Sequence, residues 1–455
     1  MTTFLVLAAT AAIIACFTYA LGMYLEGRSE QDGPQDELHG YAPDLFFVFL
    51  IPCLNEDRVI GATLEKLCTI AGHNSLILVV DDGSDDQTAA VVQSRVNGQV
   101  MLLRRQLPEA RQGKGAALNA ALEYLASTPV LQGRSSQDVI ICLMDADGRL
   151  DPHAPEAVTP YFQGGPGVGA VQVAVRIGNR HEGLLPRMQD MEFVCYSELF
   201  QRCRSHHGFA GLGGNGQFTR LSALKSLAPR PWSPSTLTED LDLGVRLVLS
   251  GWQTIYTNAA EVQQQGLSNT KALIRQRSRW FQGLLQCWHL IPQVARKSSG
   301  RVRLDMLHML LTPVLIFAAF LMTLSFIVAP VEGLLNPNLD TGRLGLNSLA
   351  AWYLLTFFPA VLFGIAYRRI TEIGRWRSMV LGHAFVLYGL LWIASGFIGV
   401  WRILRGRRGW LKTDRLSERA PSEPIPAILG QRRDASARSD SDLDWQPTSK
   451  ERVNG

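Results

Sequence analysis

Two pairs of carboxylates stand in this sequence where a ligand site would be expected. Asp81 and Asp82 directly follow an apolar stretch rich in valine, and Asp145 and Asp147 directly follow another. Open α/β sheets bind ligands at the carboxyl ends of their strands. One carboxylate there can hold Mg²⁺ or Mn²⁺, which prefer oxygen ligands, while its neighbour accepts a hydrogen bond from a ligand hydroxyl. Either pair alone could be an Asp-Gly turn or a helix cap, but two pairs in one chain favour a site.

A third acidic group consists of Glu239 and Asp240, which follow Thr238. Thr238 is a candidate N-cap for a helix that would run to residue 249, and the two acids would then only complement the helix dipole. The same placement puts a carboxylate at the mouth of a helix, where it could act as a general base.

Basic and amide side chains accompany these acids. Lys114 is flanked by glycines, so the backbone could approach an anion that the lysine neutralises, although the P-loop pattern is missing. Asn55 and Glu56 follow the first apolar stretch. The basic and aromatic sequence RQRSRW at residues 275–280 favours either a clamp for a diphosphate or an anchor at a membrane surface.

The elements that would position these residues alternate along the chain. Short apolar stretches rich in Val, Ile and Phe predict strands, and helical stretches separate the first three of them. This alternation predicts an α/β fold with a mainly parallel sheet. No GxGxxG follows any of these stretches, so the dinucleotide-binding fingerprint is absent. The expected strands are residues 45–51, 76–80, 139–144 and 168–175, and the expected helices are residues 60–71, 87–96 and 114–126.

The composition indicates a polar domain combined with apolar helices. Of the 455 residues, 47% are hydrophobic and only 18% are charged, and the formal net charge is +4. Soluble chains average about 25% charged residues. These values exclude disorder over the whole length and a strongly basic nucleic-acid binder, so no nucleic-acid partner is expected.

The seven cysteines are an odd number and include no CxxC pair, which argues against a secreted disulfide framework and against a zinc ribbon. A reducing, cytosolic setting fits the polar domain best. Cys203 lies close to His206 and His207. We interpret this group as a polar turn with one buried thiol, because no second ligand pair of metal-site spacing accompanies it.

Long uncharged stretches predict helices in a bilayer, whose core requires roughly 20 apolar residues. The expected division of the chain is a transmembrane anchor at residues 1–26, a linker at 27–43, a cytosolic catalytic domain at 44–280, an interfacial amphipathic segment at 281–303, a transmembrane region of about three hydrophobic segments at 304–402, and a basic and then disordered tail at 403–455.

The topology of the last region is left with a conflict. Basic residues before its first apolar segment and after its second both predict cytosolic loops by the positive-inside rule. Three full spans would then place the basic residues 402–412 outside. Either one segment is re-entrant or interfacial, or the rule is overridden.

The ordered set of motifs resembles the membrane-bound branch of glycosyltransferase family 2, which contains the cellulose, hyaluronan and poly-N-acetylglucosamine synthases. Each motif is unspecific alone, but the set occurs in family order over about 230 residues. The matching sequences are PCLNED at 52–57, DDGS at 81–84, GKG at 113–115, DAD at 145–147, TED at 238–240 and QRSRW, the family's QxxRW, at 276–280. The resemblance implies a cytosolic GT-A type domain that binds a nucleotide sugar, flanked by transmembrane helices.

The resemblance also implies roles for individual residues. Asp240 matches the general base, with Glu239 beside it, and Asp147 matches the ligand of a diphosphate-bound Mg²⁺ or Mn²⁺. Acceptor binding is implied for the GNGQF loop and for QRSRW, through Asn215, Gly216, Gln276 and Trp280. The residues implied in nucleotide-sugar binding are Asn55, Glu56, Asp81, Asp82, Lys114, Asp145 and Arg279.

The expected function is therefore inverting transfer of glucose or N-acetylglucosamine from a UDP-sugar to a growing β-linked polysaccharide, at the inner or plasma membrane, in a multi-pass enzyme. An accessory secretion or export subunit is a possible partner. QRSRW favours this polymer. The alternative is transfer of one sugar to a membrane lipid such as diacylglycerol, which GNGQF and the few spans favour. A non-catalytic scaffold or transporter is the remote alternative. Transport paths usually need charged residues within the membrane, and no predicted span contains one.

Overall fold

The computed structural model describes residues 2–29, 45–72, 74–335 and 341–407. Its central element is an eight-stranded sheet with the order β3-β2-β1-β4-β7-β6-β8-β5. The first four of these strands are parallel. They are β1 (Phe46–Cys53), β2 (Ser75–Asp81), β3 (Val100–Arg104) and β4 (Val139–Leu143). Strands β1, β2 and β4 were expected from the sequence, and β3 was not.

The other half of the sheet is mixed. Strand β7 (Gln217–Arg220) is antiparallel to β4 and to β6 (Val168–Ile177). Strand β8 (Gln253–Gln264) is parallel to β6, and the short β5 (Arg149–Leu150) is antiparallel to β8. A mainly parallel sheet is thus the right description only of the first half. The chain enters β7 from the loop at residues 213–216, which reverses its direction relative to β4.

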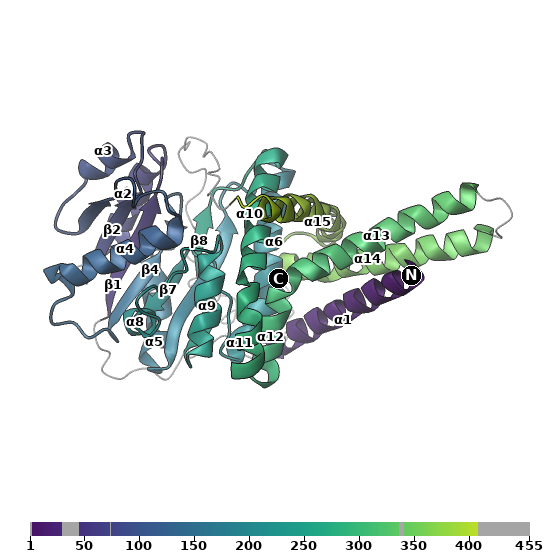
Figure 1. Ribbon diagram of the computed structural model, residues 1–455, viewed down its shortest axis with the longest axis horizontal. Helices are drawn as coiled ribbons and strands as arrows, with labels where there is room; N and C mark the ends of the chain where they lie inside the picture. The colour runs from purple at the N-terminus through teal and green to yellow at the C-terminus, as the bar shows by residue number, and fades with distance from the viewer. Residues whose placement is uncertain (1, 30–44, 73, 336–340, 408–455) are drawn as a thin grey trace, which may run out of the picture. The chain divides into compact units, whose positions relative to one another are not determined.

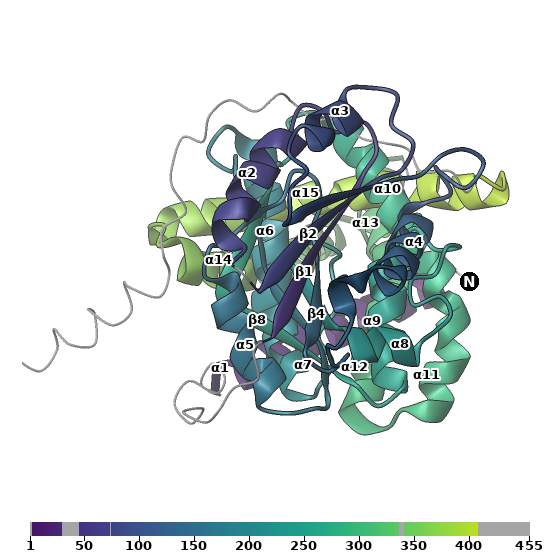
Figure 2. The same cartoon turned by 90° about the vertical axis from the view of Figure 1, so that its left-hand side faces the viewer.

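Helices cover both faces of the sheet (Figure 2). Alternate residues of β1 point to opposite faces, and all eight of its residues are buried, as expected for a strand covered on both sides. On one face α2 (Ile60–Ile70) and α5 (Ala154–Gln163) pack through apolar side chains. On the other face α4 (Lys114–Ser127), α8 (Leu221–Ser226) and α9 (Glu239–Leu249) do the same. The short α3 (Thr88–Gln93) lies beside β2 and β3.

A second group of helices borders the β8 side of the sheet. It comprises α6 (Leu184–Tyr196), a π-helical turn at Ser197–Gln201, α7 (Arg202–His206), α10 (Thr270–Gln286), α11 (Ile291–Lys297) and α12 (Gly300–Leu310). Helix α10 carries the whole QRSRW motif and continues past it. The domain boundary expected between residues 280 and 281 therefore falls inside a helix.

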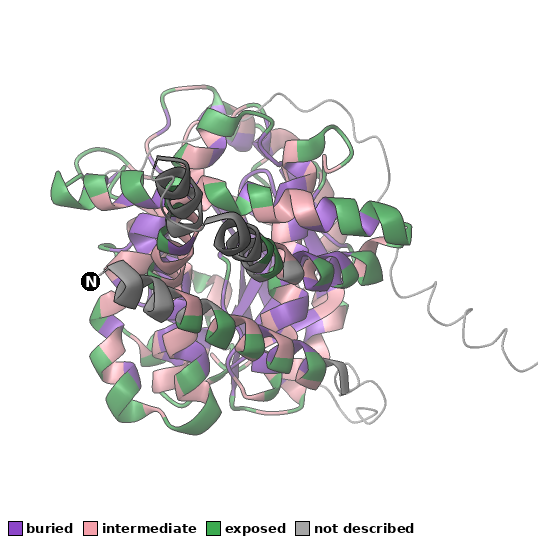
Figure 3. Cartoon of the chain, turned by 90° about the vertical axis from the view of Figure 1, so that its right-hand side faces the viewer, coloured by how far each residue is buried: buried purple, intermediate pink, exposed green. Residues whose placement is uncertain are grey.

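Three long helices, α1 (Thr2–Ser29), α13 (Thr312–Leu335) and α14 (Thr341–Thr371), run side by side away from the sheet (Figure 1). Helix α15 (Arg375–Leu404) is seen nearly end-on in Figure 1 and lengthwise in Figure 2, so it crosses the direction of the other three. Figure 3 looks onto the side from which α1, α13 and α14 project, and the residues coloured there include both buried and exposed ones.

Length and composition single out one of the described helices, α15, as able to cross a membrane. Helices α12 and α13 pass the same test together, up to Leu324, but the chain bends by 58° between them. The first of the three hydrophobic segments predicted at 304–402 is therefore divided between two helices in the structure.

Candidate active site

The loops after β1 and β2 are tied to each other by the residues predicted to bind a nucleotide. The Asn55 backbone N–H donates to Ser84 Oγ (2.9 Å), and Asn55 Oδ1 accepts from the Asp85 N–H (3.0 Å). Asp81 is fully buried, and its Oδ1 accepts from the Ser84 N–H (2.9 Å). Asn55 and Asp81 thus hold the shape of these loops, and Asp81 Oδ2 also forms an ion pair with Arg104 at the end of β3 (3.4 Å).

Asp82 retains a carboxylate oxygen that could bind a ligand. Its Oδ1 forms an ion pair with Arg105, whereas its Oδ2 is buried and accepts no hydrogen bond from the described residues. Burial raises the pKa of Asp82, and Arg105 partly opposes this rise. Glu56 is half-buried beside this loop, and its N–H donates to Thr88 Oγ1 (2.7 Å). The pair Asp82 and Glu56 therefore lines one wall at the ends of β1 and β2.

Lys114 connects the acidic groups that were separate in the sequence. Its ammonium nitrogen lies 2.8 Å from Asp145 Oδ1, 3.7 Å from Glu239 Oε1 and 3.2 Å from the carbonyl oxygen of Gly214. Burial disfavours this charge, but Asp145, Glu239 and Asp240 outweigh it and raise the pKa of Lys114. Lys114 is the first residue of α4, which follows Gly113 at a φ of 108°. Such a φ suits glycine.

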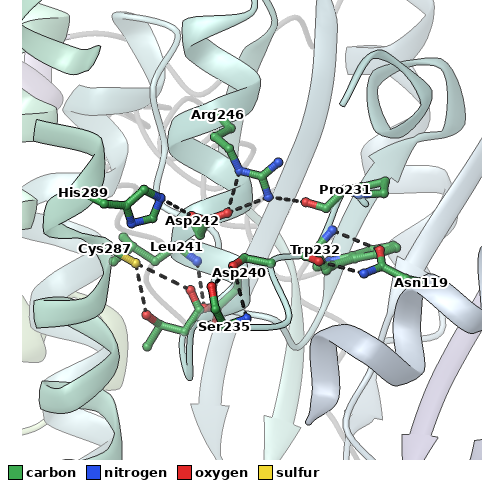
Figure 4. Close-up of polar contacts among 12 residues, drawn as sticks. Asn119, Pro231, Trp232, Ser235, Asp240, Leu241, Asp242, Arg246, Cys287 and His289 are labelled. Atoms are coloured by element: carbon green, nitrogen blue, oxygen red, sulfur yellow. Dashed lines mark hydrogen bonds and ion pairs between the residues drawn. The ribbon is translucent and has the colours of Figure 1, made fainter. Parts of the chain in front are cut away.

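Glu239 and Asp240 begin helix α9. Burial raises the pKa of Glu239 to about 7 and also raises the pKa of Asp240, while Lys114 lowers both. Two neighbouring carboxyl groups with raised pKa values are suited to proton transfer near neutral pH. Thr238 is the residue before the helix, as expected, but its side chain makes no capping hydrogen bond. In Figure 4 the Leu241 N–H donates to Asp240 Oδ1 (2.7 Å).

The GNGQF loop closes the other wall of the site. Asn215 is buried, accepts from the Asp145 N–H (3.2 Å) and donates to Gln264 Oε1 (3.1 Å). Gly214 has a φ of 67°, and a Cβ added there would lie 3.0 Å from Asp240 Oδ2. Gly216 has a φ of 64°, and a Cβ there would lie within 2.7 Å of two valine side chains. Both positions therefore require glycine.

Asp147 lies behind Asp145, buried, and its Oδ2 accepts from the Gln265 N–H (3.2 Å). Together these two aspartates offer the carboxylate oxygens that Mg²⁺ and Mn²⁺ prefer, next to the Asp82 wall and the Lys114 cluster. The donor set fits such a cation.

The QRSRW residues occupy α10, and its buried arginine is one that the sequence analysis passed over. Arg277 is almost fully buried and forms an ion pair with Glu192 of α6 (2.5 Å), and its guanidinium stacks 3.9 Å from the Trp280 ring. Gln276 Oε1 accepts from Arg277 (2.9 Å), and Arg279 is half-buried on the same helix. Gln276 and Trp280 thus contact Arg277 on their own helix, and within the described residues the structure does not bring them into the Lys114 cluster.

Gly214 and Arg105 lie against predicted site residues, and Glu192 holds Arg277 within the QRSRW motif; the predicted set contained none of these four. The doubled glycine of GGNGQ was a signal for Gly214, since only glycine readily takes its φ. Nothing near Glu192 in the sequence indicates its partner 85 residues away.

The chain is similar to known proteins in sequence and in fold. Residues 43–283, just over half of the chain, match the family model described as glycosyltransferase like family 2. A beta-monoglucosyldiacylglycerol synthase of Trichormus variabilis is 34% identical over 287 residues, which cover 61% of this chain and 57% of that protein. A probable glucomannan 4-beta-mannosyltransferase of Arabidopsis thaliana is 29% identical over 250 residues, with 53% and 43% covered. The chain thus spans about half the length of these relatives.

A solved structure shares the fold. A mannosyltransferase from Pyrobaculum calidifontis, in complex with GDP-Man and Mn²⁺, superposes with a TM-score of 0.60 at 17% identity, covering 88% of this chain and 99% of that one. With the family match, this likeness establishes a GT-A type α/β fold with a mixed sheet. The acids and the lysine gathered at the strand ends thus belong to a glycosyltransferase, and the chain is a member of glycosyltransferase family 2.

Proposed function

We propose that this enzyme transfers one glucose residue from UDP-glucose to a membrane lipid such as diacylglycerol. The observation that carries transfer chemistry is the cluster of Lys114 with Asp145, Glu239 and Asp240, which brings three separate motifs together. The lipid acceptor is supported by the relatives named as glucosyldiacylglycerol synthases, one of them 34% identical. This reverses the preference for a polysaccharide that QRSRW gave.

In this proposal Asp240 takes the proton of the acceptor hydroxyl. The acceptor oxygen forms a bond to the anomeric carbon as the bond to the diphosphate oxygen breaks, and UDP leaves with the bonding electron pair. One such displacement inverts an α-linked donor to a β product. Asp82 and Glu56 bind the base, and Lys114 lies beside Asp145, which takes the ribose. Arg279 supports the diphosphate, and the loop with Asn215 and Gly216 bounds the acceptor end together with Gln276 and Trp280.

Asp147, with Asp145 beside it, would hold Mg²⁺ or Mn²⁺. When bound, the cation neutralises charge on the leaving diphosphate.

We also propose how the enzyme meets the bilayer. Helices α1, α13 and α14 would span it, since 24 residues of α13 extend about 36 Å and the bilayer core measures about 30 Å. Helix α15 would lie at the surface, because it packs along α10: Ser395 Oγ donates to the Ile274 carbonyl (3.3 Å), and Arg402 Nε donates to Gln282 Oε1 (2.8 Å). Its outward apolar residues, with Trp376 82% and Trp401 57% exposed, would then face lipid.

This arrangement removes the conflict in the positive-inside rule. With α15 in the interface, the basic residues before α13, after α14 and after α15 all lie on the cytosolic side. The catalytic domain would then be cytosolic, at the inner or plasma membrane. Its predicted end at residue 280 moves to the end of α10, and the predicted anchor at residues 1–26 is kept.

The decisive experiment supplies labelled UDP-glucose to the purified enzyme in liposomes that contain diacylglycerol. We expect label in a solvent-extractable monoglucosyl lipid, none with liposomes lacking diacylglycerol, and less with UDP-N-acetylglucosamine. Label in insoluble chains that a β-glycosidase degrades would instead establish the polysaccharide synthase, which QRSRW and the glucomannan relative favour. Only that outcome would call for an export subunit.

A further inference from the structure

A second cluster of polar side chains lies away from the candidate active site, where α1 meets α7 and α12. Glu26 comes from the end of α1, whereas Cys203 and His207 stand four residues apart at α7. Their ligand-type atoms, a carboxylate oxygen, a thiol sulfur and an imidazole nitrogen, all lie within 4.8 Å of one another. In the sequence only the cysteine and the histidines lie close together, because Glu26 is more than 170 residues away.

Both ring nitrogens of His207 face carboxylates. Nδ1 lies 3.0 Å from Asp305 Oδ2, and Nε2 lies 2.9 Å from Glu26 Oε1. Ionised carboxylates only accept hydrogen bonds, and a neutral imidazole carries a single N–H. One ring nitrogen of a neutral His207 would therefore point its lone pair at a carboxylate oxygen. A proton on each ring nitrogen, or a metal ion bound at one of them, would remove this repulsion.

The outer contacts have the arrangement found around metal-binding histidines, which usually donate their second ring N–H to a carboxylate. Asp305 is fully buried and is itself held by a hydrogen bond from the Tyr19 hydroxyl. Arg301 binds the other oxygen of Glu26 (2.6 Å), which leaves Oε1 directed at His207. Both acids are thus fixed by partners outside the cluster.

We propose that Glu26, Cys203 and His207 form a Zn²⁺ site. Sulfur, nitrogen and oxygen donors suit zinc, and three protein ligands leave one position for water or another ligand. Magnesium and calcium are disfavoured because they prefer oxygen ligands only. The ion would fasten α1 to α7, while Asp305 on α12 orients the histidine. This site does not depend on the proposed acceptor.

The thiol provides a specific signal for the test. Cys203 is buried, and its thiol lies with the Glu26 carboxylate and the His207 ring. A bound divalent metal would bring the thiolate, and Co²⁺ in place of Zn²⁺ would then show a thiolate-to-metal charge-transfer absorption. The aspartates of the active site contain no sulfur and give no such band.

The experiment uses the full chain purified in detergent. After washing with a weak chelator, we expect about one zinc per chain by mass spectrometry, and the charge-transfer band when Co²⁺ is exchanged in. Cys203→Ser should lose the band and most of the zinc, and His207→Gln should lose zinc. Cys68→Ser, at an exposed cysteine on α2, is the matched control and should keep both.

The wild-type protein alone is enough to overturn the proposal, so a variant that fails to fold cannot hide the answer. If it retains no zinc and Co²⁺ gives no thiolate band, His207 is a protonated bridge between Glu26 and Asp305. Zinc that is retained equally by Cys203→Ser and the wild type would also refute this site. Neither readout requires transfer activity, so a wrong acceptor would leave the result unchanged.

Discussion

At the scale of single residues, the protonation of the candidate base depends on Lys114. Glu239 and Asp240 are neighbours whose burial favours the neutral acids, and the lysine is the cation that opposes this. Because the two carboxyl groups interact, they titrate as a pair and not as independent groups. Burial thus raises the pKa of the candidate base above the usual carboxyl range, and its ionised form can accept the proton of a hydroxyl.

We expect Asp240→Asn to bind UDP as the wild type does and to lose about 10²–10⁴ in kcat, because the amide cannot accept the proton. Turnover of labelled UDP-glucose and calorimetric titration with UDP measure the two properties. Glu123→Gln changes an exposed carboxylate on α4 and serves as the control. Normal turnover in Asp240→Asn would contradict the assignment.

The pH dependence should follow the same pair. Below a raised carboxyl pKa the group is neutral and cannot act as a base, so kcat/KM should rise with pH as the pair ionises. Within this pair burial raises the pKa of Glu239 to about 7. In Lys114→Met the charge that lowers both pKa values is gone, and the rise in kcat/KM should move to higher pH. A pH–rate profile of both proteins tests this, and an unshifted rise would separate Lys114 from the base.

At the scale of elements, two parts of the chain position these groups. The loop before β7 brings its backbone against Asp240 and Lys114, and the helix pair α10 and α15 fixes the QRSRW motif. Tyr388 and Trp392 of α15 both donate to Glu192 (2.7 and 2.8 Å), the carboxylate that also binds Arg277. Glu192 is thus the point where α6, α10 and α15 meet.

Gly214→Ala should lower the rate of glucose transfer at least tenfold without unfolding the protein. The new methyl group would lie 3.0 Å from Asp240 Oδ2 at a φ of 67°. Gly133→Ala is the matched control, since Gly133 has a φ of 76° but nothing within 4 Å of its added Cβ. Both changes should cost about 1–2 kcal/mol in the unfolding free energy from backbone strain. Equal activity of the two variants would show that the contact is unimportant.

Glu192→Gln should lower the free energy of unfolding by up to about 3–5 kcal/mol, because it leaves the buried Arg277 guanidinium without its counter-charge. It should also raise KM for the acceptor more than KM for the donor. Glu65→Gln breaks an exposed ion pair with Arg95 and should cost at most about 1 kcal/mol. Thermal unfolding in detergent compares the two variants, and similar melting temperatures would show that the buried Glu192–Arg277 ion pair does not stabilise the protein.

At the scale of the whole molecule, the direction of α15 decides the topology. If α15 lies at the membrane surface, both of its ends face the cytosol. Glu372, before the helix, and Arg407, after it, can each be replaced by cysteine in a Cys68→Ser background. We expect an impermeant maleimide to label both from the side on which the wild-type Cys68 reacts. Labelling of Arg407→Cys from the opposite side would show that α15 spans the bilayer.

From the sequence alone we could predict the family, the strands β1, β2, β4 and β6, and the strand-end placement of Asp82 and Asp145. These features are local: apolar runs form buried strands, and acids directly after them must lie at one edge of a parallel sheet. Strands β7 and β8 were not predicted, because their sequences QFTR and QTIYTNAAEVQQ contain few apolar residues, and the apolar β3 was missed as well.

Which charged side chains contact each other could be learned only from the tertiary structure. Lys114 contacts acids that are 31 and 125 residues away, Arg277 contacts Glu192 at a separation of 85, and His207 contacts Glu26 at a separation of 181. Such pairs are chosen by the packing of whole helices against the sheet and not by the spacing of residues along the chain. The same packing places α15 along α10, although its length and composition are those of a membrane span. Composition measures how apolar a helix is, whereas its neighbours fix the direction in which it runs.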